Sequence, residues 1–333
     1  MNNFKKILVT GGAGYCGGVL IPLLLKKGYK VIVYDIMFFG FGHLPKDPNL
    51  EIIKADIRDI NQFNDSLGDV DVVLHLACIS NDSSFVLNEK LSETINYDAF
   101  EPLVISSKKF GVKRFIYASS SSVYGVSEKL NVTEEHPLVP LTLYNKFKGL
   151  CEPLLFKHID NDFEGVIFRP ATVCGYSPRL RLDVSVNILT NYAVNKGFIK
   201  VFGGQQMRPN LHILDYADLC LKLIEAPKDK INGEIFNCGH ENLKIIKIAD
   251  SIKSLIEQKY DKEISINIEE SDDNRSYHIN SDKVKRILNF VPKLSIQDAV
   301  SGLCESFENK LIPDSFENDI YYNVKTIMKS DIK

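Results

Sequence analysis

A glycine-rich segment that follows the first apolar run constrains the fold more than any other part of the chain. Ile7-Leu8-Val9 is apolar throughout, as a parallel strand buried on both faces requires. Gly11, Gly14 and Gly17 come next, and a helix-compatible segment then ends at Gly28. In a dinucleotide-binding unit, these glycines permit a tight turn, the approach of backbone to a pyrophosphate, and close packing of the helix, whose N-terminus faces the phosphates. The sequence therefore predicts such a unit at its start.

A second apolar run ends in an acidic residue at the spacing that these units have. Residues 31–34 are apolar and Asp35 follows them directly. A carboxylate at this point accepts hydrogen bonds from both ribose hydroxyls of NAD and repels the 2′-phosphate of NADP. Residues 36–40 contain no arginine or lysine that could bind that phosphate. We therefore expect NAD as the cofactor.

The spacing Gly-x-x-Gly-x-x-Gly, with Thr10 before it and Tyr15 inside it, indicates a family. It resembles the extended short-chain dehydrogenase/reductase family, and within it the NAD-dependent nucleotide-sugar epimerase and dehydratase branch, of the 4-epimerase or 4-dehydrogenase type. The resemblance implies an α/β fold in which a Rossmann-type doubly wound parallel sheet carries a smaller mixed α/β C-terminal substrate domain.

The length of the chain suits this organisation. With 333 residues, 44% of them hydrophobic, it can bury a large core and form two domains. We expect residues 1–170, with a return near 205–238, to form the NAD-binding domain. Residues 171–204 and 239–333 would then form the nucleotide-sugar-binding domain.

Charge, hydropathy and cysteine usage exclude several other classes of protein. The net charge of -3 is spread along the chain, so no nucleic-acid partner is expected. No apolar run reaches the ~18 residues of a membrane span, and no signal peptide precedes the first strand, so no membrane partner is expected either. The seven cysteines form no Cys-x-x-Cys pair and join no histidine cluster. They indicate free thiols of a cytoplasmic protein and no metal site.

A tyrosine and a lysine form the predicted catalytic pair. Tyr144 and Lys148 lie one helical turn apart, behind a serine turn and a proline-rich loop. Oxidising a sugar alcohol requires a base, and the phenol of free tyrosine has a pKa of about 10. A lysine ammonium and the positive nicotinamide ring would both lower that pKa. Tyr144 is therefore the expected acid and base, Lys148 its tuner and a ribose ligand, and Ser120 the family's serine that hydrogen-bonds the reacting oxygen.

The resemblance also implies further cofactor contacts. In the family, an acid and an aliphatic residue after the third strand hold the adenine, the end of the fourth strand lines the nicotinamide ribose side, and an asparagine lies nearby. His75, in the fourth strand, occupies a structural position of the family. The predicted cofactor-binding residues are Gly11, Gly14, Tyr15, Cys16, Gly17, Asp35, Asp56, Ile57, Leu76, Ala77, Asn96, Tyr144 and Lys148.

Two arginines are implied for the diphosphate of the sugar nucleotide, because a guanidinium pairs with its oxygens. The family pattern weakens after the sixth strand, where Thr172 replaces the usual asparagine and Cys174 the usual tyrosine. The predicted substrate-binding residues are Ser120, Ser122, Thr172, Asn187, Arg208 and Arg275.

The residues before Val-Tyr-Gly distinguish the reactions of the family. Dehydratases have Asp-Glu there, decarboxylases have Glu, and fucose-synthase-type enzymes have a cysteine in the segment. This chain has Ser121 and Ser122, which cannot serve as acid and base near neutral pH. Of the reactions known in the family, oxidation and reduction at one carbon are the ones that remain.

Three functions fit that chemistry or the fold. A 4-epimerase oxidises C4 transiently to a 4-keto sugar, whereas a 4-dehydrogenase of the GDP-heptose type, or a ketoreductase, runs half of that cycle. The stretch from Arg169 to Asp183 resembles a subgroup that contains both epimerases and heptose 4-dehydrogenases. A non-catalytic NAD(P)-binding sensor or scaffold is the third reading, but such relatives have usually lost the tyrosine or the lysine.

The family further implies a homodimer that pairs helices near residues 97–110 and 144–160. Apolar side chains on these segments would form the interface or, equally, belong to the core. They are Leu103, Val104, Leu150, Leu154 and Leu155.

Overall fold

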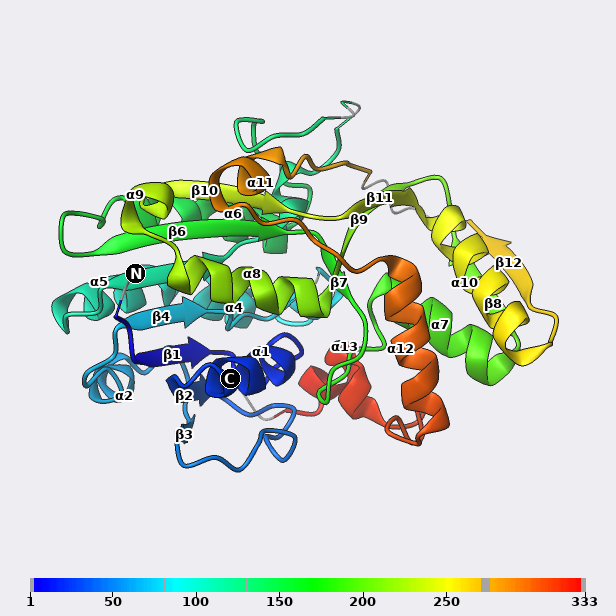
Figure 1. The fold of residues 1–333 in the computed structure, drawn as a ribbon, viewed down its shortest axis with the longest axis horizontal. Helices are drawn as coiled ribbons and strands as arrows, with labels where there is room; N and C mark the ends of the chain where they lie inside the picture. The colour runs from blue at the N-terminus through cyan, green and yellow to red at the C-terminus, as the bar shows by residue number, and fades with distance from the viewer. Residues whose placement is uncertain (1–2, 81, 128, 130, 271–275, 331–333) are drawn as a thin grey trace.

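A parallel sheet of seven strands forms the centre of the protein (Figure 1). The computed structural model describes residues 3–80, 82–127, 129, 131–270 and 276–330. The strand order is β10-β6-β5-β4-β1-β2-β3, and every pairing is parallel. The strands are β1 Lys6–Thr10, β2 Lys30–Asp35, β3 Leu50–Lys54, β4 Val72–His75, β5 Arg114–Ala118, β6 Glu164–Pro170 and β10 Glu234–Cys238. This confirms the predicted Rossmann-type sheet.

Helices cover both faces of this sheet, which explains why its strands are apolar on both sides. Ile7 and Val9 pack toward one face and Leu8 toward the other, as the period of two requires. Helices on the first face are α1 Gly17–Lys26, α8 Ile213–Glu225 and α11 Asp282–Leu288. Those on the second face are α2 Ile60–Asp65, α5 Phe100–Lys109 and α6 Leu143–Phe156.

The helix expected from residue 97 is divided in two. A π-helical turn, η1, spans Thr94–Asp98, and α5 begins at Phe100. Pro102 falls in the first turn of α5, where its missing N–H breaks no helical hydrogen bond. Other short elements are α3 Asp82–Phe85, α4 Glu89–Glu93, the 3₁₀ turn η2 Ser121–Tyr124 and α9 Lys228–Ile231.

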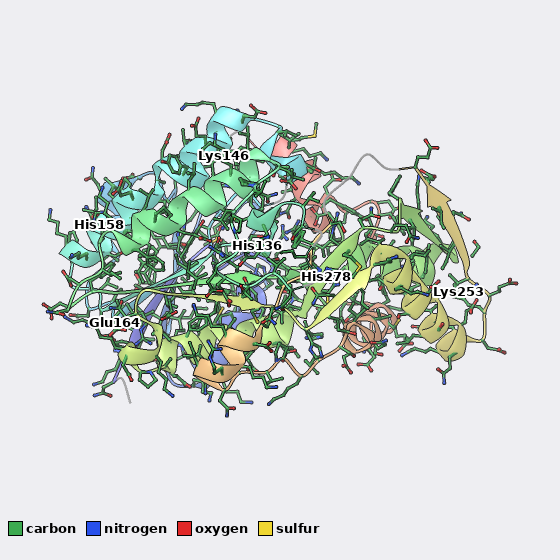
Figure 2. All side chains as sticks on the ribbon, turned by 90° about the horizontal axis from the view of Figure 1, so that it is seen from above. His136, Lys146, His158, Glu164, Lys253 and His278 are labelled. Carbon is green, nitrogen blue, oxygen red and sulfur yellow. The ribbon has the colours of Figure 1, made fainter. Side chains whose placement is uncertain are left out.

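A smaller mixed α/β unit lies beside the large sheet. Figure 2 shows Lys253 of this unit at one end of the molecule and His158 and Glu164 at the other. One small sheet has the order β11-β9-β7 and a second pairs β12 with β8. The elements are β7 Thr172–Cys174, β8 Phe198–Phe202, β9 Met207–His212, β11 Glu241–Lys244, β12 Ser265–Glu269, α7 Ser185–Lys196, α10 Ile245–Tyr260 and α12 Ile296–Glu308. Isoleucine, valine and alanine side chains form a separate core between these helices and strands.

The chain passes between the two units more often than the sequence indicates. Helix α8 and strand β10 return to the large sheet within the range 205–238, as expected, but β9 joins the small sheet. Helix α11, which lies in the segment assigned to sugar binding, packs on β10. The domain boundaries themselves stay a prediction.

The C-terminal segment runs back toward the large sheet after α12. It contains the 3₁₀ turn η3 Asp319–Tyr321 and helix α13 Asn323–Met328, which lies against α3 (Figure 1, red). The backbone N–H of Leu182 donates to the carbonyl oxygen of Tyr321 at 2.9 Å. The segment is thereby attached to the loop that follows β7.

Most of the apolar residues expected at a dimer interface belong to the core. Leu103 and Val104 of α5 and Leu155 of α6 are buried in the core on the second face of the sheet. Leu154 of α6 is partly buried and packs against the same core. Leu150 remains 40% exposed. The homodimer stays a prediction, and of the five residues only Leu150 is exposed enough to contribute to it.

Within the described ranges no helix is long and apolar enough to cross a bilayer. The seven cysteines are free thiols, and the same ranges contain no cluster of three metal-ligating side chains.

Replacing Gly17 with alanine should destabilise the protein, because the added Cβ would lie 2.1 Å from the carbonyl oxygen of Gly12. Backbone shifts forced by an extra methyl group in a packed site cost roughly 1–3 kcal/mol. Gly302 is a matched control, since it also lies in a helix but a Cβ there meets nothing within 4 Å. Gly302→Ala should raise stability by roughly 0.5–1 kcal/mol. Urea unfolding of both variants measures the difference, and a Gly17→Ala protein as stable as the wild type would contradict the packing argument.

Candidate functional site

A cavity of about 700 Å³ lies where the carboxyl ends of the large sheet meet the small unit. This is the position at which open parallel sheets bind ligands. Most of the residues singled out from the sequence line it: Gly11, Gly14, Tyr15, Cys16, Asp35, Asp56, Ile57, Leu76, Ala77, Ser120, Ser122, Tyr144, Lys148, Thr172 and Arg208. Gly17, Asn96 and Asn187 are not among the lining residues, and Arg275 lies outside the described residues.

The glycine turn forms one wall of the cavity. Gly11 has φ +70°, and a Cβ on it would lie 2.6 Å from the backbone nitrogen of Ala77, so the turn and the end of β4 touch through backbone alone. A Cβ on Gly14 would meet one neighbour, the carbonyl oxygen of Gly11 at 3.1 Å. The space beside Gly14 is therefore open to the cavity, and it lies at the N-terminus of α1. A pyrophosphate fits this cradle.

Gly17 permits close packing of the helix, as expected, but the contact is with the glycine turn and not with a strand. Its Cβ would collide with Gly12, which is part of the turn. Gly12 in turn packs on Val33 of β2, with contacts of 3.0 and 3.1 Å for an added Cβ. Helix, turn and sheet are thus stacked through two glycines, and Gly17 shapes the cavity without lining it.

Asp35 lies at the end of β2 with both carboxylate oxygens held by backbone. Its Oδ2 accepts from the N–H of Ala13 at 3.0 Å and its Oδ1 from the N–H of Met37 at 2.7 Å. Burial raises the pKa of Asp35, and these two hydrogen bonds oppose that effect. The carboxylate is fixed in place at the cavity, as a ribose ligand requires.

Arg58, which does not line the cavity and was not singled out from the sequence, holds Asp56 at the cavity wall. Arg58 forms an ion pair with Asp56, with 2.6 Å between Nη2 and Oδ2, and its backbone N–H donates to Oδ1. Against the effect of burial, these hydrogen bonds lower the pKa of Asp56. Ile57 follows and lines the cavity beside it.

Asn96 supports the cavity from behind. Its side-chain oxygen accepts from the N–H of Ile79 at 2.8 Å, and its amide donates to the carbonyl oxygen of the same residue at 2.9 Å. Ile79 lines the cavity next to Leu76 and Ala77. The structure thus places Asn96 near the cofactor region, where it fixes the segment after β4.

Tyr144 and Lys148 both lie on α6 and both line the cavity, in keeping with the helical spacing predicted for them. Thr142 begins the helix as its N-cap, and its hydroxyl donates to the carboxylate of Asp82. Lys148 is only 4% exposed, and its Nζ donates to the carbonyl oxygen of Ala118 at 2.7 Å. The lysine is therefore tied to the end of β5.

The pKa of Tyr144 is raised in the protein itself, an effect that the sequence did not show. Burial raises it well above the ordinary value, Cys78 and Asp82 add to this, and Arg181 opposes it. The protein alone therefore keeps the phenol protonated at neutral pH. A base needs a lower pKa than this, so we expect Lys148 and the bound nicotinamide to supply the opposing positive charge.

Ser120 is part of a short chain of hydrogen bonds. Its Oγ lies 2.8 Å from Oγ of Ser122, which donates to Oδ1 of Asn145 at 2.5 Å. Because the single proton of Ser122 goes to the asparagine, Ser120 is the donor between the two serines. Asn145 is fully buried next to Tyr144, so the serine turn and α6 are linked at the cavity wall.

His75 lies in the core and does not line the cavity. Its Nδ1 is 2.8 Å from the hydroxyl of Thr10, and burial, followed by Lys148, lowers its pKa to about 3. The ring is neutral at physiological pH, and its position agrees with the structural role expected from the family.

Asn187 is turned away from the cavity, which does not support its predicted diphosphate contact. Its Oδ1 accepts from the N–H of Gly175, and its amide donates to the hydroxyl of Tyr15 and to the carbonyl oxygen of Arg181. Every polar atom of the amide is thus used inside the protein. Asn187 holds the turn after β7 against the glycine turn.

Whereas Asp35 lines the cavity from the large sheet, Arg208 lines it from the small unit. It is on β9, half-buried, and its Nη1 donates to the carbonyl oxygen of Met207 at 3.0 Å. Thr172 and Tyr277 line the cavity between the two units. The glycine turn, Tyr144 and an arginine of the small unit therefore line one cavity.

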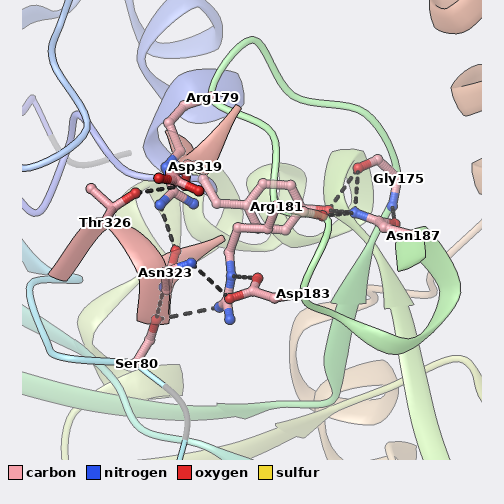
Figure 3. A network of polar contacts seen from close by, with 10 residues as sticks. Ser80, Gly175, Arg179, Arg181, Asp183, Asn187, Asp319, Asn323 and Thr326 are labelled. Carbon is pink, nitrogen blue, oxygen red and sulfur yellow. Dashed lines mark hydrogen bonds and ion pairs between the residues drawn. The ribbon is translucent and has the colours of Figure 1, made fainter. Parts of the chain in front are cut away.

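A polar network after β7 was not expected from the sequence (Figure 3). Arg179 and Arg181 line the cavity, and Nε of Arg181 donates to Asp183 at 2.8 Å. Asn323 of α13 donates to Ser80 at 2.8 Å and accepts from Arg179 at 2.5 Å. The only signal in the sequence was the unusual run Ser-Pro-Arg-x-Arg-x-Asp, because contact with a residue near position 323 follows no local pattern.

Comparison with known proteins identifies the family. Residues 7–239 match the NAD dependent epimerase/dehydratase family. The chain is 33% identical over 219 residues to the uncharacterized protein y4nG of Sinorhizobium fredii, and 30% identical over 268 residues to a putative UDP-arabinose 4-epimerase 2 of Arabidopsis thaliana. These matches cover 65% and 70% of this chain but 52% and 63% of the relatives. The chain thus spans between half and two thirds of the length of these relatives.

One solved structure is similar to this chain over nearly the whole length of both proteins. The UDP-glucuronic acid 4-epimerase of Bacillus cereus, in complex with UDP-glucuronic acid and NAD, superposes with a TM-score of 0.81 at 28% identity. The match covers 92% of this chain and 99% of that one. The protein belongs to the NAD-dependent epimerase/dehydratase family. It is an enzyme of that family, and NAD is its cofactor.

Protein stripped of nucleotide should bind NAD at least about 100-fold more tightly than NADP, because the fixed carboxylate of Asp35 repels a 2′-phosphate by several kcal/mol. Asp35→Asn should narrow this ratio, whereas Asp65→Asn, at an exposed position, should not. Isothermal calorimetry with both dinucleotides measures the ratio. Equal or tighter binding of NADP by the wild type would show the assignment of Asp35 to be wrong.

Proposed function

We propose that the protein is an NAD-dependent nucleotide-sugar 4-epimerase, which oxidises C4 transiently to a 4-keto sugar. The observation that carries the proposal is the arrangement of the cavity. Tyr144, Lys148 and Ser120 line the same cavity as Asp35 of the large sheet and Arg208 of the small unit. The positions at which relatives of the dehydratase type have acids are Ser121 and Ser122.

Each residue has a role in this proposal. NAD, when bound, would supply the group that accepts a hydride from C4 of the sugar and can give it back. Tyr144 takes the proton of the C4 hydroxyl and gives it back to the oxygen of the keto sugar. Ser120 donates to that oxygen after turning its hydroxyl away from Ser122, and Lys148 holds the ribose and favours the phenolate. Arg208, together with Arg275 as predicted from the sequence, binds the diphosphate while the keto sugar rotates in the cavity.

The relatives support a nucleotide-sugar substrate without fixing which one. One relative is named a UDP-arabinose epimerase and one structure contains UDP-glucuronic acid, so a UDP-sugar is the first class to test. The same cavity suits a 4-dehydrogenase or a ketoreductase, since these use the same residues for half of the cycle. A non-catalytic sensor is disfavoured because Tyr144 and Lys148 are both present at the cavity. We further propose a cytoplasmic homodimer that acts in carbohydrate biosynthesis.

Tyr144→Phe should lower turnover by about 10²–10⁴, the usual loss when a general acid–base is removed. NAD binding should change little, because the ring and its packing are kept. Tyr29→Phe is the control, since Tyr29 packs against the core away from the cavity. Steady-state kinetics and calorimetry on both variants separate catalysis from binding. Near-normal turnover of Tyr144→Phe would assign the base to another residue.

The reaction itself is tested with candidate nucleotide sugars. An epimerase should give the C4 epimer in NMR spectra without accumulation of NADH at 340 nm, because the hydride returns to the same sugar. A keto sugar formed in proportion to NADH, with no epimer, would overturn the epimerase in favour of the dehydrogenase. A protein that binds NAD tightly yet converts no nucleotide sugar would favour the sensor reading.

A further inference from the structure

The loop after β7 crosses the N-terminal turn of α1. The hydroxyl of Ser177 donates to the carbonyl oxygen of Tyr15 at 2.8 Å. A Cβ on Gly18 would lie 2.8 Å from that hydroxyl and 3.5 Å from the backbone nitrogen of Arg179. The backbone of Arg179 therefore lies directly against the N-terminal end of α1, where a dinucleotide places its phosphates.

The guanidinium of Arg179 is buried and forms no ion pair with a described residue, although Asp183 and Asp35 lie close enough to act on it electrostatically. The residue is 4% exposed and lines the cavity, with Cζ 3.5 Å from the centre of the Phe39 ring. Its Nη2 donates to the neutral side chain of Asn323, and its Nε has no partner among the described residues. Burial, and then Arg181, lower its pKa. A buried cation in this state is unfavourable until an anion joins it.

Among the described residues, the two other buried arginines are each paired with a carboxylate. Arg114 lies 2.6 Å from Glu164, and Arg169 lies 2.5 Å from Glu152. No such ion pair with a described residue is formed by Arg179, although it is as deeply buried. The difference indicates that its anion comes from a ligand.

The acids nearest to Arg179 are already engaged. Asp35 accepts two backbone hydrogen bonds, and Asp183 accepts from Arg181 and from the N–H of Asn323. The guanidinium groups of Arg179 and Arg181 both act electrostatically on Cys16, the N-cap of α1. The free position for an anion is thus the cradle between Arg179 and that helix end.

We propose that Arg179 binds the pyrophosphate of NAD from the side opposite α1, and that Asn323 of the C-terminal helix holds its guanidinium in position. Asn323 is 4% exposed and makes three contacts that fix it: its backbone N–H donates to Asp183 at 2.9 Å, its amide to Ser80 at 2.8 Å, and its side-chain oxygen accepts from Arg179 (Figure 3). The phosphates lie between helix N–H groups and a guanidinium fork.

This proposal depends on NAD binding and on no particular sugar reaction. Arg179→Gln should bind NAD and ADP about 10- to 100-fold more weakly than the wild type, the scale for hydrogen bonds to charged groups, whereas adenosine should bind equally. Arg286→Gln is the matched control, because Arg286 is exposed on α11. Calorimetry on stripped protein gives the three affinities for each variant.

Stability separates a ligand role from a structural one. Without nucleotide, Arg179→Gln should melt at the same temperature as the wild type or higher, since it removes an unpaired buried cation. Its melting temperature should rise less on addition of NAD. Asn323→Ala should release NAD faster than the wild type, as measured by stopped-flow displacement. The melting temperature of this variant should also rise less than that of the wild type on addition of NAD.

Three results would overturn the proposal. An Arg179→Gln variant that binds NAD within twofold of the wild type removes the contact. A variant that melts far below the wild type without nucleotide makes Arg179 structural. A variant that loses NADP binding selectively, with NAD unchanged, assigns the guanidinium to a 2′-phosphate instead.

Discussion

The structure depends on contacts between backbone segments that no side chain separates. A Cβ on Gly17 would meet Gly12, and one on Gly11 would meet Ala77, both at distances that real Cβ atoms do not show. Helix α1 is thereby seated on the turn, and the turn on the end of β4. The cradle beside Gly14 exists because these contacts leave only that face open. The position of Asp35, which is held by the N–H of Ala13 in the same turn, follows from them as well.

The features that local pattern encodes were predicted well. Apolar runs gave the strands of the parallel sheet, since a strand buried on both faces has no polar alternation. Glycine spacing gave the turn, and the interval between Tyr144 and Lys148 placed both on one helix at the cavity. The division of the expected helix near 97–110 was missed, because the π-helical turn at Thr94–Asp98 depends on packing against α6.

What the sequence could not provide depends on contacts between distant segments. Asn187 was expected to face the diphosphate, but the turn at Gly175 and the hydroxyl of Tyr15 use its amide completely. The lowered pKa predicted for Tyr144 in the presence of Lys148 and NAD stays a prediction, but the sequence did not show that burial raises this pKa in the protein itself. Neither the enclosure of a side chain nor the partner that takes its hydrogen bonds can be read from neighbouring positions.

The place of α13 has a consequence for how the protein is made. Ser80 and Asn323 are 243 positions apart and both line the cavity that the glycine turn opens. The first strands of the large sheet emerge from the ribosome long before that helix, so a nascent chain can pair them while its cofactor cavity is still open on one side. Closure of the cavity by α13 therefore follows the pairing of these strands during synthesis.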